Sequence, residues 1–362
     1  MAAVNAAVWE ALRHAGVEPR VIDLSAPSLD RSLIVRFGRL PRVLRGLFRL
    51  VAMPRLRGGT LYMSVSGGLG QLYELSFVSL ARLRGMKLCI HHHSFAYLNA
   101  PSRLTRILAK AADASAVHVA LSPRMAERLK AVYGVIRVVP VSNAVFLVND
   151  EGQLAESPSS WLGTLGFISN IAAEKGVFDF LDLMSAAQDM RLPLRAKLAG
   201  PFQDAETERQ VHARLATLPA VEYVGPKYGA EKDAFFASIN ALVFPTRYVN
   251  EAEPLTLHEA MSRAIPVIAY GRGAIPEIVE PECGKVIDPA EPFVPAALAQ
   301  IEGWLADPAA FAAASSAATR RFAEIYVQSE QHWQTLLREL TGGMSEQVRS
   351  SSAGMEESSS QT

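Results

Sequence analysis

Two carboxylates in the second half of the chain have the type and spacing to bind a phosphorylated sugar. Glu251 and Glu259 stand eight residues apart, and we expect Glu251 in a loop and Glu259 one to two turns into the following helix. The backbone N–H groups of Leu255 and Thr256 then point out of the helix start, where a pyrophosphate is electrostatically favoured. One carboxylate can accept hydrogen bonds from a ribose diol and the other from a second sugar. The alternative is an ordinary helix with acidic residues near its N-terminus.

Three adjacent histidines, His91, His92 and His93, end a predicted strand at the edge where open α/β sheets bind ligands. His91 and His93 share one face of a strand and His92 lies on the other. Three consecutive histidines cannot converge on one ion, and no nearby cysteine or carboxylate pattern completes a shell. We therefore predict no metal site here and leave open whether each histidine binds a ligand or is structural.

A glycine-rich turn, Ser66–Gly70, follows a predicted strand and precedes a helix. It lacks the G-x-G-x-x-G spacing of dinucleotide-binding turns, and no acidic residue follows at the ribose-binding distance. An acceptor-facing loop and a plain tight turn remain as interpretations. The chain also contains no Asp-x-Asp pair to hold a divalent ion, so we expect no metal and no cofactor.

The elements that must position these residues alternate between strand and helix, which predicts parallel βαβ units and a doubly wound sheet in each half. We expect a first half at 1–147, a linker at 148–160, a second α/β half at 161–305, and helices at 306–341 that partly pack back on the first half. The tail at 342–362 is rich in serine and glutamate and is expected to be disordered. The predicted strands of the first half lie near 21–24, 61–65, 87–90, 117–121 and 137–141, and those of the second near 162–167, 195–199, 221–224, 241–244, 266–269 and 285–287.

Composition agrees with a globular protein of two domains. The chain has 362 residues, a formal net charge of zero and two cysteines, which excludes a disulfide framework and favours a reducing cytoplasm. No apolar run is long enough to cross a bilayer. The charge is uneven, because 31–73 holds eight arginines and no acidic residue. We expect a local anionic partner and no binding of nucleic acid.

The arginine-rich stretch includes a helix at about 41–52. Arg42, Arg45 and Arg49 fall on one side of it, and valine, leucine and phenylalanine side chains fall on the other. This pattern is typical of a helix that lies in an anionic membrane interface, at the inner face of the membrane for a cytoplasmic protein. The alternative is an amphipathic helix that packs on the sheet.

The segment from Asn250 to Ala269, followed by Gly273–Val279 and Gly284–Ile287, resembles the E-x7-E region of family 4 glycosyltransferases. The likeness extends over about 61–330 and is strongest at 160–290. It implies the GT-B fold, in which two Rossmann-like domains face a cleft, and retaining transfer of a sugar from a nucleotide-diphosphate donor. Pro254 departs from the family, which usually has glycine there, and removes one backbone N–H donor.

The same resemblance implies roles for individual residues. Glu259 would bind the donor ribose and Glu251 the transferred sugar. Lys175 would neutralise the leaving diphosphate, the kind of electrostatic help that usually dominates such catalysis. The arginine that the family often has near Asn170 is missing, so phosphate contacts are also expected from the turn at Gly200.

The resemblance also places a histidine near the donor sugar and the acceptor, and we favour His93, then His92. The acceptor is not identified by the sequence; a lipid-linked or polysaccharide acceptor, as in cell-envelope synthesis, is expected from similar enzymes. Two alternatives stay open: a nucleotide-sugar epimerase of similar architecture, and a catalytically weakened sugar-nucleotide-binding protein. We further expect that the first N-terminal strand and its glycine-rich loop are missing, with Val21–Leu24 as the second strand.

Overall fold

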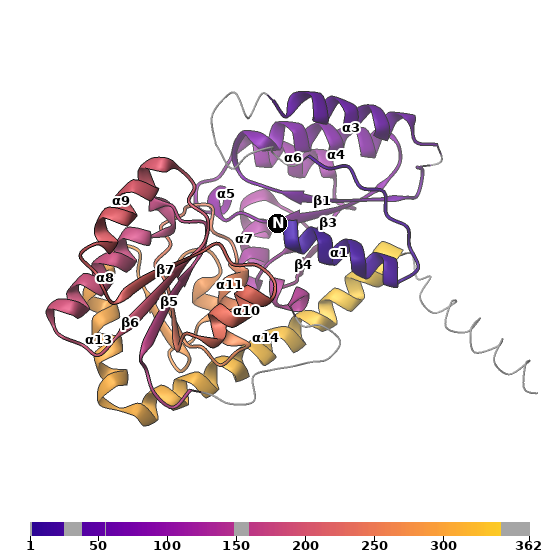
Figure 1. Ribbon diagram of the computed structural model, residues 1–362. Helices are drawn as coiled ribbons and strands as arrows, with labels where there is room; N and C mark the ends of the chain where they lie inside the picture. The colour runs from indigo at the N-terminus through magenta and orange to yellow at the C-terminus, as the bar shows by residue number, and fades with distance from the viewer. Residues whose placement is uncertain (1, 25–37, 55, 148–158, 342–362) are drawn as a thin grey trace, which may run out of the picture. The chain divides into compact units, whose positions relative to one another are not determined.

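The computed structural model describes residues 2–24, 38–54, 56–147 and 159–341, which belong to two compact units (Figure 1). Unit 1 comprises Met1–Phe146 and Val327–Thr362, and unit 2 comprises Leu147–Tyr326. The predicted linker falls outside the described residues except for 159 and 160, and the predicted tail lies wholly outside them. The two units are described separately below.

Unit 1 contains a parallel sheet of four strands in the order β1-β2-β3-β4. The inner strands β2 and β3 are almost completely buried, as expected where helices cover both faces of a parallel sheet. The strands are β1 (Thr60–Val65), β2 (Lys87–His92), β3 (Val117–Ala120) and β4 (Val138–Pro140).

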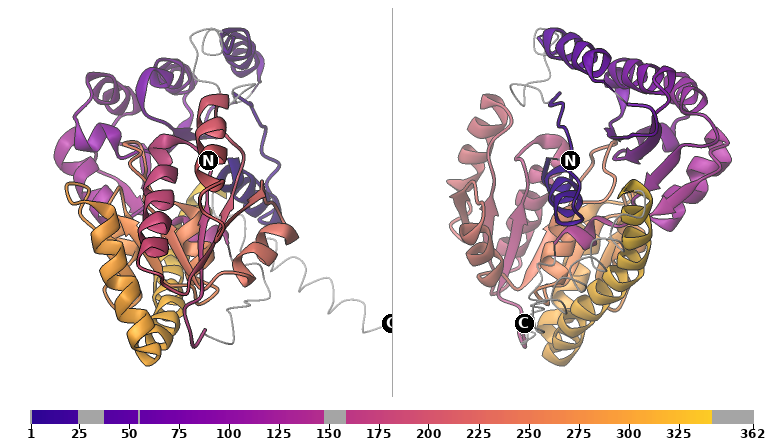
Figure 2. Two further views of the ribbon diagram at one scale, coloured as in Figure 1. Left: turned by 60° about the vertical axis from the view of Figure 1, so that its left-hand side comes forward. Right: turned by 90° about the vertical axis from the view of Figure 1, so that its right-hand side faces the viewer.

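The helices of unit 1 begin and end where the sequence places caps. The side chains of Ser102 and Ser122 accept hydrogen bonds from the backbone two or three residues into the helices that they precede, and Gly134, at a φ of 68°, ends one of them. The helices are α1 (Ala2–His14), α3 (Leu40–Ala52), α4 (Gln71–Leu83), α5 (Ala96–Asn99), α6 (Arg103–Ala112) and α7 (Pro123–Tyr133), with 3-10 turns η1 (Gly68–Gly70) and η2 (Asn143–Phe146). In Figures 1 and 2, α3 packs on α4, which contacts the strands β1 and β2.

The strand predicted at Val21–Leu24 is wrong. The backbone at 21–24 has no strand partner, and among the described residues β1 pairs with β2 alone. Ile22 and Leu24 instead pack on the hydrophobic core of unit 1, and the Arg39 guanidinium donates a hydrogen bond to the Leu24 carbonyl at 2.8 Å. An apolar run without a neighbouring backbone ladder forms no sheet, whatever its residue preferences.

Unit 2 contains a parallel sheet of six strands in the order β10-β9-β8-β5-β6-β7. The first strand, β5, therefore lies in the middle, and the chain winds from it to one side and then to the other. The strands are β5 (Thr164–Ile168), β6 (Arg195–Ala199), β7 (Val221–Gly225), β8 (Ala241–Phe244), β9 (Val267–Tyr270) and β10 (Gly284–Ile287). All strands predicted from the sequence except the one at Val21–Leu24 are confirmed to within two residues.

Helices cover both faces of this sheet, and α8 packs against α13 on one of them (Figure 2). The core between helices and sheet is built from large apolar side chains such as Phe167, Phe180 and Tyr270. The helices are η3 (Ala173–Lys175), α8 (Val177–Asp189), α9 (Ala205–Leu215), α10 (Ala230–Ala237), α11 (Leu255–Met261), α12 (Ile275–Ile278), α13 (Phe293–Ala306) and α14 (Pro308–Thr341).

The last helix, α14, contributes residues to both units. From Val327 onward it belongs to unit 1, where the Ser329 hydroxyl accepts a hydrogen bond from the Ser142 backbone N–H at 3.2 Å. Trp333 packs edge-on against Phe146 in the same unit. The second half of α14 is thus part of the first α/β unit.

Candidate functional site

The carboxyl ends of β5 and β8 meet at the point where the winding of the second sheet reverses. In open α/β sheets, ligands bind outside the strands at such a switch point. The loop after β5 carries Lys175, in η3, and the loop after β8 carries Glu251. Two positions 76 residues apart in sequence are thereby brought to one place.

Lys175 and Glu251 form an ion pair. The lysine Nζ lies 2.7 Å from Glu251 Oε2, and the two side chains are 18% and 11% exposed. The same carboxylate oxygen accepts a hydrogen bond from the Thr246 hydroxyl at 3.0 Å, and the Tyr248 ring lies 4.5 Å below the ammonium group. The pair is partly shielded from water, which strengthens its electrostatic attraction.

Two glycines let the backbone come close enough for this contact. Gly176, at a φ of 83°, would bring a Cβ to 2.0 Å from the Pro245 carbonyl oxygen. Gly273, at a φ of 57°, would bring one to 2.5 Å from the Glu251 carbonyl oxygen. Any other residue would push the Lys175 turn or the Glu251 loop away.

Glu259 lies on α11, as predicted, and is also paired with a lysine. Lys232 Nζ, from α10, lies 2.5 Å from both carboxylate oxygens of Glu259. The lysine is 28% exposed and the glutamate 16%. Each carboxylate of the predicted pair thus has its own ammonium partner.

A buried pair inside the same segment fixes the loop to the helix. His258 Nε2 lies 3.0 Å from Glu253 Oε1, and these side chains are 0% and 2% exposed. Glu253 belongs to the loop and His258 to α11. Glu251 lies two residues before Glu253, and Glu259 directly follows His258. The contact therefore fixes the positions of Glu251 and Glu259 relative to each other.

The remaining predicted residues of unit 2 lie at the same edge of its sheet. Leu255 and Thr256 are the first two residues of α11, where amides have no carbonyl one turn earlier. Asn170 is exposed just after β5, and Gly200 follows β6, the neighbour of β5. A Cβ at Gly200 would lie 1.8 Å from the Ser169 carbonyl oxygen, so only glycine allows these two turns to touch.

The three histidines lie in unit 1 at the carboxyl end of β2. As predicted, His91 and His93 share a face, with ring centroids 4.1 Å apart. His92 lies on the other face of the strand, and both of its ring nitrogens have hydrogen-bond partners. Nδ1 lies 2.9 Å from Tyr97 Oη, and Nε2 lies 2.9 Å from His118 Nδ1.

Burial keeps these histidines neutral. It lowers the pKa of His91 and His92 well below the usual value and that of His93 to about 3. The Nε2 atoms of His91 and His93 are buried and lack a protein partner, whereas both ring nitrogens of His92 have one.

The turn at Ser66–Gly70 is held by Glu74, one turn into α4. Its Oε1 accepts hydrogen bonds from the Ser66 backbone N–H at 3.0 Å and from the Ser66 hydroxyl at 2.9 Å. Burial raises the pKa of Glu74 from 4.5 to about 7, and the hydrogen bonds from Ser66 oppose that rise. The sequence did not single out this glutamate, although it is the first acidic residue after the arginine-rich stretch.

Within the described ranges, no three histidine, cysteine, aspartate or glutamate side chains lie close enough to hold a metal ion. None of the helices in those ranges combines the length and apolar character needed to cross a bilayer.

The residues that sequence reasoning missed are those that hold the predicted ones. Thr246 belongs to the Pro245–Thr246 turn before the loop. The sequence predicts this turn, but it does not predict the hydrogen bond from Thr246 to Glu251. Lys232 sits in an ordinary helix start, and nothing in its surroundings marks it as the partner of Glu259.

Comparison with known proteins gives a family match and a fold. Residues 163–315 match the sequence model of a family described as glycosyl transferases group 1. No curated protein sequence matches the chain.

Several solved structures are similar. HepE of Anabaena, crystallised with UDP, is 18% identical at a TM-score of 0.64, over 83% of each chain. Sucrose-phosphate synthase of Thermosynechococcus elongatus is 19% identical at a TM-score of 0.62, over 84% of this chain and 79% of its own. The pneumococcal O-GlcNAc transferase GtfA, crystallised with UDP and GlcNAc, is 15% identical at a TM-score of 0.64. The match covers 81% of this chain and 59% of the GtfA chain. These likenesses confirm the predicted fold class, an α/β chain with two parallel-sheet domains of the GT-B type.

Proposed function

We propose that this chain is a retaining glycosyltransferase that moves a sugar from a nucleotide-diphosphate sugar to an acceptor. The donor site is the Lys175–Glu251 site of unit 2. The reaction breaks the bond between the anomeric carbon and a diphosphate oxygen, which leaves with the electron pair. It forms a bond from the same carbon to an acceptor oxygen, whose proton passes to the departing diphosphate or to water.

The observation that carries this proposal is the ion pair between Lys175 and Glu251. It lies at the switch point of the second sheet and inside the segment that matches the group 1 glycosyltransferase model. A sugar nucleotide carries one group that can bind each member of this ion pair in place of its present partner. Its diphosphate is an anion for the ammonium, and its sugar hydroxyls are donors for the carboxylate.

Lys175 has the charge needed for departure of the leaving group. As the glycosidic bond breaks, negative charge grows on the diphosphate, and an ammonium group already fixed nearby stabilises that charge without reorganising. The first amides of α11, at Leu255 and Thr256, add partial positive charge beside it. Asn170 and the turn at Gly200 supply the remaining polar contacts.

Glu259 is assigned to the ribose of the donor. Its carboxylate is held 2.5 Å from Lys232, so the site is electrically neutral before binding. A ribose diol can donate two hydrogen bonds to the carboxylate while the lysine remains in place. Such contacts do not change during the reaction and support binding more than catalysis.

His93 is assigned to the sugar and acceptor. It stands at the carboxyl edge of the first sheet, is neutral at pH 7 and has a ring nitrogen without a protein partner. A neutral imidazole can both accept and donate hydrogen bonds to hydroxyl groups. His92 has no free nitrogen, and its assigned task is to orient the strand end through Tyr97 and His118.

The donor class is supported by what relatives of the same fold bind. Structures of HepE contain UDP and UDP-glucose, and the structure of GtfA contains UDP and GlcNAc. We therefore name a uridine-diphosphate sugar as the first donor to test.

The experiment is incubation of the purified chain with UDP-glucose, UDP-N-acetylglucosamine and related donors, with lipid-linked or polysaccharide acceptors and without any. Mass spectrometry follows release of the nucleotide diphosphate, and NMR gives the anomeric configuration of the product. We expect transfer with retention that persists in excess chelator, because the ammonium group of Lys175 and the first amides of α11 supply positive charge for the leaving diphosphate.

Three outcomes would count against the proposal. Conversion of the donor into an isomer without acceptor indicates an epimerase. Donor binding without turnover indicates a binding protein. Loss of activity in chelator, restored by magnesium or manganese, contradicts the metal-independent mechanism alone.

A further inference from the structure

Helix α3 of unit 1 is anchored along one side. Val43, Gly46 and Leu50 are buried and pack on the unit 1 core. A Cβ at Gly46 would lie 2.7 Å from the Ile22 side chain and 2.9 Å from Phe77, so the helix rests directly on both. The spacing of these residues, three and then four, places them on one narrow face.

A second side of α3 is apolar and exposed. The sequence places all apolar residues of this helix opposite its arginines, but the structure buries only some of them. Those left exposed recur every three or four residues and so form one row: Leu40 (43% exposed), Leu44 (57%), Phe48 (71%) and Val51 (49%). A contiguous apolar row is a mark of an interaction site, unlike single exposed apolar residues.

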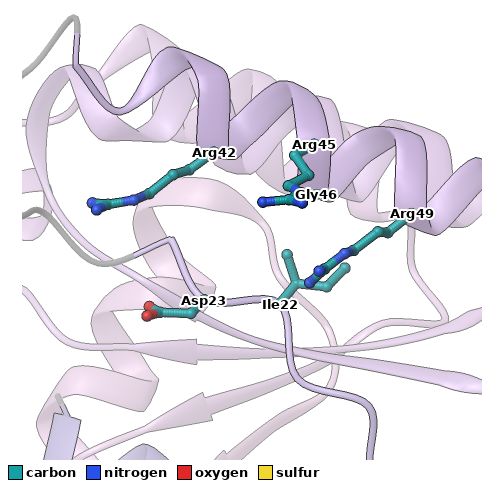
Figure 3. Close-up of a pocket in the computed structure, with 6 residues that line it drawn as sticks. All are labelled: Ile22, Asp23, Arg42, Arg45, Gly46 and Arg49. Atoms are coloured by element: carbon teal, nitrogen blue, oxygen red, sulfur yellow. The ribbon is translucent and has the colours of Figure 1, made fainter.

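The third side of α3 is cationic and lines a pocket. Arg42, Arg45 and Arg49 line an open pocket of about 190 Å³ together with Ile22, Asp23 and Gly46. Figure 3 shows the three arginine side chains on the side of the helix that faces the Ile22–Asp23 segment, with Arg49 reaching towards Ile22. Three guanidinium groups face one carboxylate there, so the pocket carries an excess of positive charge.

Such a pocket has the chemistry to bind a phosphate group. Guanidinium groups present planar forks of N–H donors that match phosphate oxygens, and they bind them in two-pronged fashion. An anion would also relieve the mutual repulsion of three neighbouring cations. Free phosphate and the phosphate of a lipid headgroup share this chemistry.

We propose that α3 binds an anionic lipid surface, with a headgroup phosphate in the arginine pocket and the exposed apolar row against the acyl chains. The row favours a lipid over free phosphate, because a soluble anion would leave the four apolar side chains exposed to water, whereas acyl chains would cover them. Helices that lie in the membrane interface combine an apolar face with arginines in this way. The proposal does not depend on the proposed function, because its readout is binding.

The test is co-sedimentation of the full chain with vesicles of phosphatidylcholine alone or with 30% phosphatidylglycerol, at low and high salt. We expect binding to the anionic vesicles only, and release at high salt because the arginine charges are screened. The variant R42Q/R45Q/R49Q should reduce binding at least tenfold. All three side chains are exposed, so the fold should survive, which circular dichroism checks.

A matched control removes the same charge from another helix of unit 1. Arg103, Arg106 and Lys110 on α6 are exposed and lie outside the pocket, and their triple glutamine variant should bind within about twofold of the parent. The variant L44S/F48S should lose vesicle binding while keeping its arginines.

Two results would overturn the proposal. One is vesicle binding that R42Q/R45Q/R49Q leaves unchanged. The other is stabilisation by millimolar inorganic phosphate, lost in that variant, without any binding of anionic vesicles; the pocket would then take a soluble anion.

Discussion

Replacing Lys175 with methionine should separate its electrostatic role in catalysis from its role in stability. Methionine keeps the length and apolar stem of lysine and removes the charge that lies 2.7 Å from Glu251. The two effects have different sizes and can be measured separately.

The stability effect follows from the burial of the pair. Removing one member of a fully buried ion pair costs about 3–5 kcal/mol, because the other charge is left unpaired. Here the side chains are 18% and 11% exposed, and Thr246 still donates to Glu251. We therefore expect a loss on the order of 1–2 kcal/mol, after discounting for solvent screening. For a unit of this size that lowers Tm by roughly 2–8 °C.

The catalytic effect should be larger. Removing one group that stabilises developing negative charge lowers kcat by about 10²–10³. The assay is steady-state release of nucleotide diphosphate, alongside thermal unfolding of the same preparations. The control is K285M in the same unit, where an exposed lysine on β10 is replaced; it should change neither quantity.

The double variant K175M/E251Q decides between the two roles. It removes both charges, so it should recover most of the lost Tm without recovering kcat. If K175M retains kcat within about threefold of the parent while Tm falls, Lys175 serves only to neutralise Glu251 and its assignment to the leaving group is refuted.

Two further predictions concern Glu259 and Glu74. Glu259→Gln should raise KM for the donor severalfold with little change in kcat, because a contact made equally in the ground and transition states affects binding alone; an equal fall in kcat and kcat/KM would argue against the ribose assignment. Glu74→Gln should match the parent in stability near pH 5 and exceed it near pH 8, in urea unfolding at both values. Because the folded pKa of Glu74 is raised from 4.5 to about 7, the parent loses stability as pH rises through that window, on the order of 3 kcal/mol at most. The control is Glu222→Gln, which changes an exposed glutamate on β7. A stability advantage of E74Q that does not change with pH would contradict the reasoning.

The sequence by itself determined the class of fold and the local setting of the carboxylates. Alternation of short apolar runs with amphipathic helices predicts parallel βαβ units, because each pattern depends only on neighbouring residues. The same local rules placed Glu251 in a loop and Glu259 on the helix after it. Period-two geometry likewise put His91 and His93 on one face.

The sequence failed where a residue's state depends on a distant partner. Val21–Leu24 has the composition of a strand, yet it forms none, because no strand among the described residues pairs with it to complete the hydrogen bonds. On α3, the sequence marks every apolar residue alike. Only the packing of this helix on the unit 1 core decides that Val43 and Leu50 are buried while Phe48 is exposed.

The contacts of the candidate site were decided by the tertiary structure. Lys175 meets Glu251 because β5 lies beside β8 in the sheet, an order that no local pattern encodes. The pairing of Lys232 with Glu259 depends in the same way on how α10 and α11 are placed. Charged groups form an ion pair only when the fold has brought them to within a few ångströms of each other. Residue types and spacing therefore identified the candidate residues, and the order of the strands decided which of them meet.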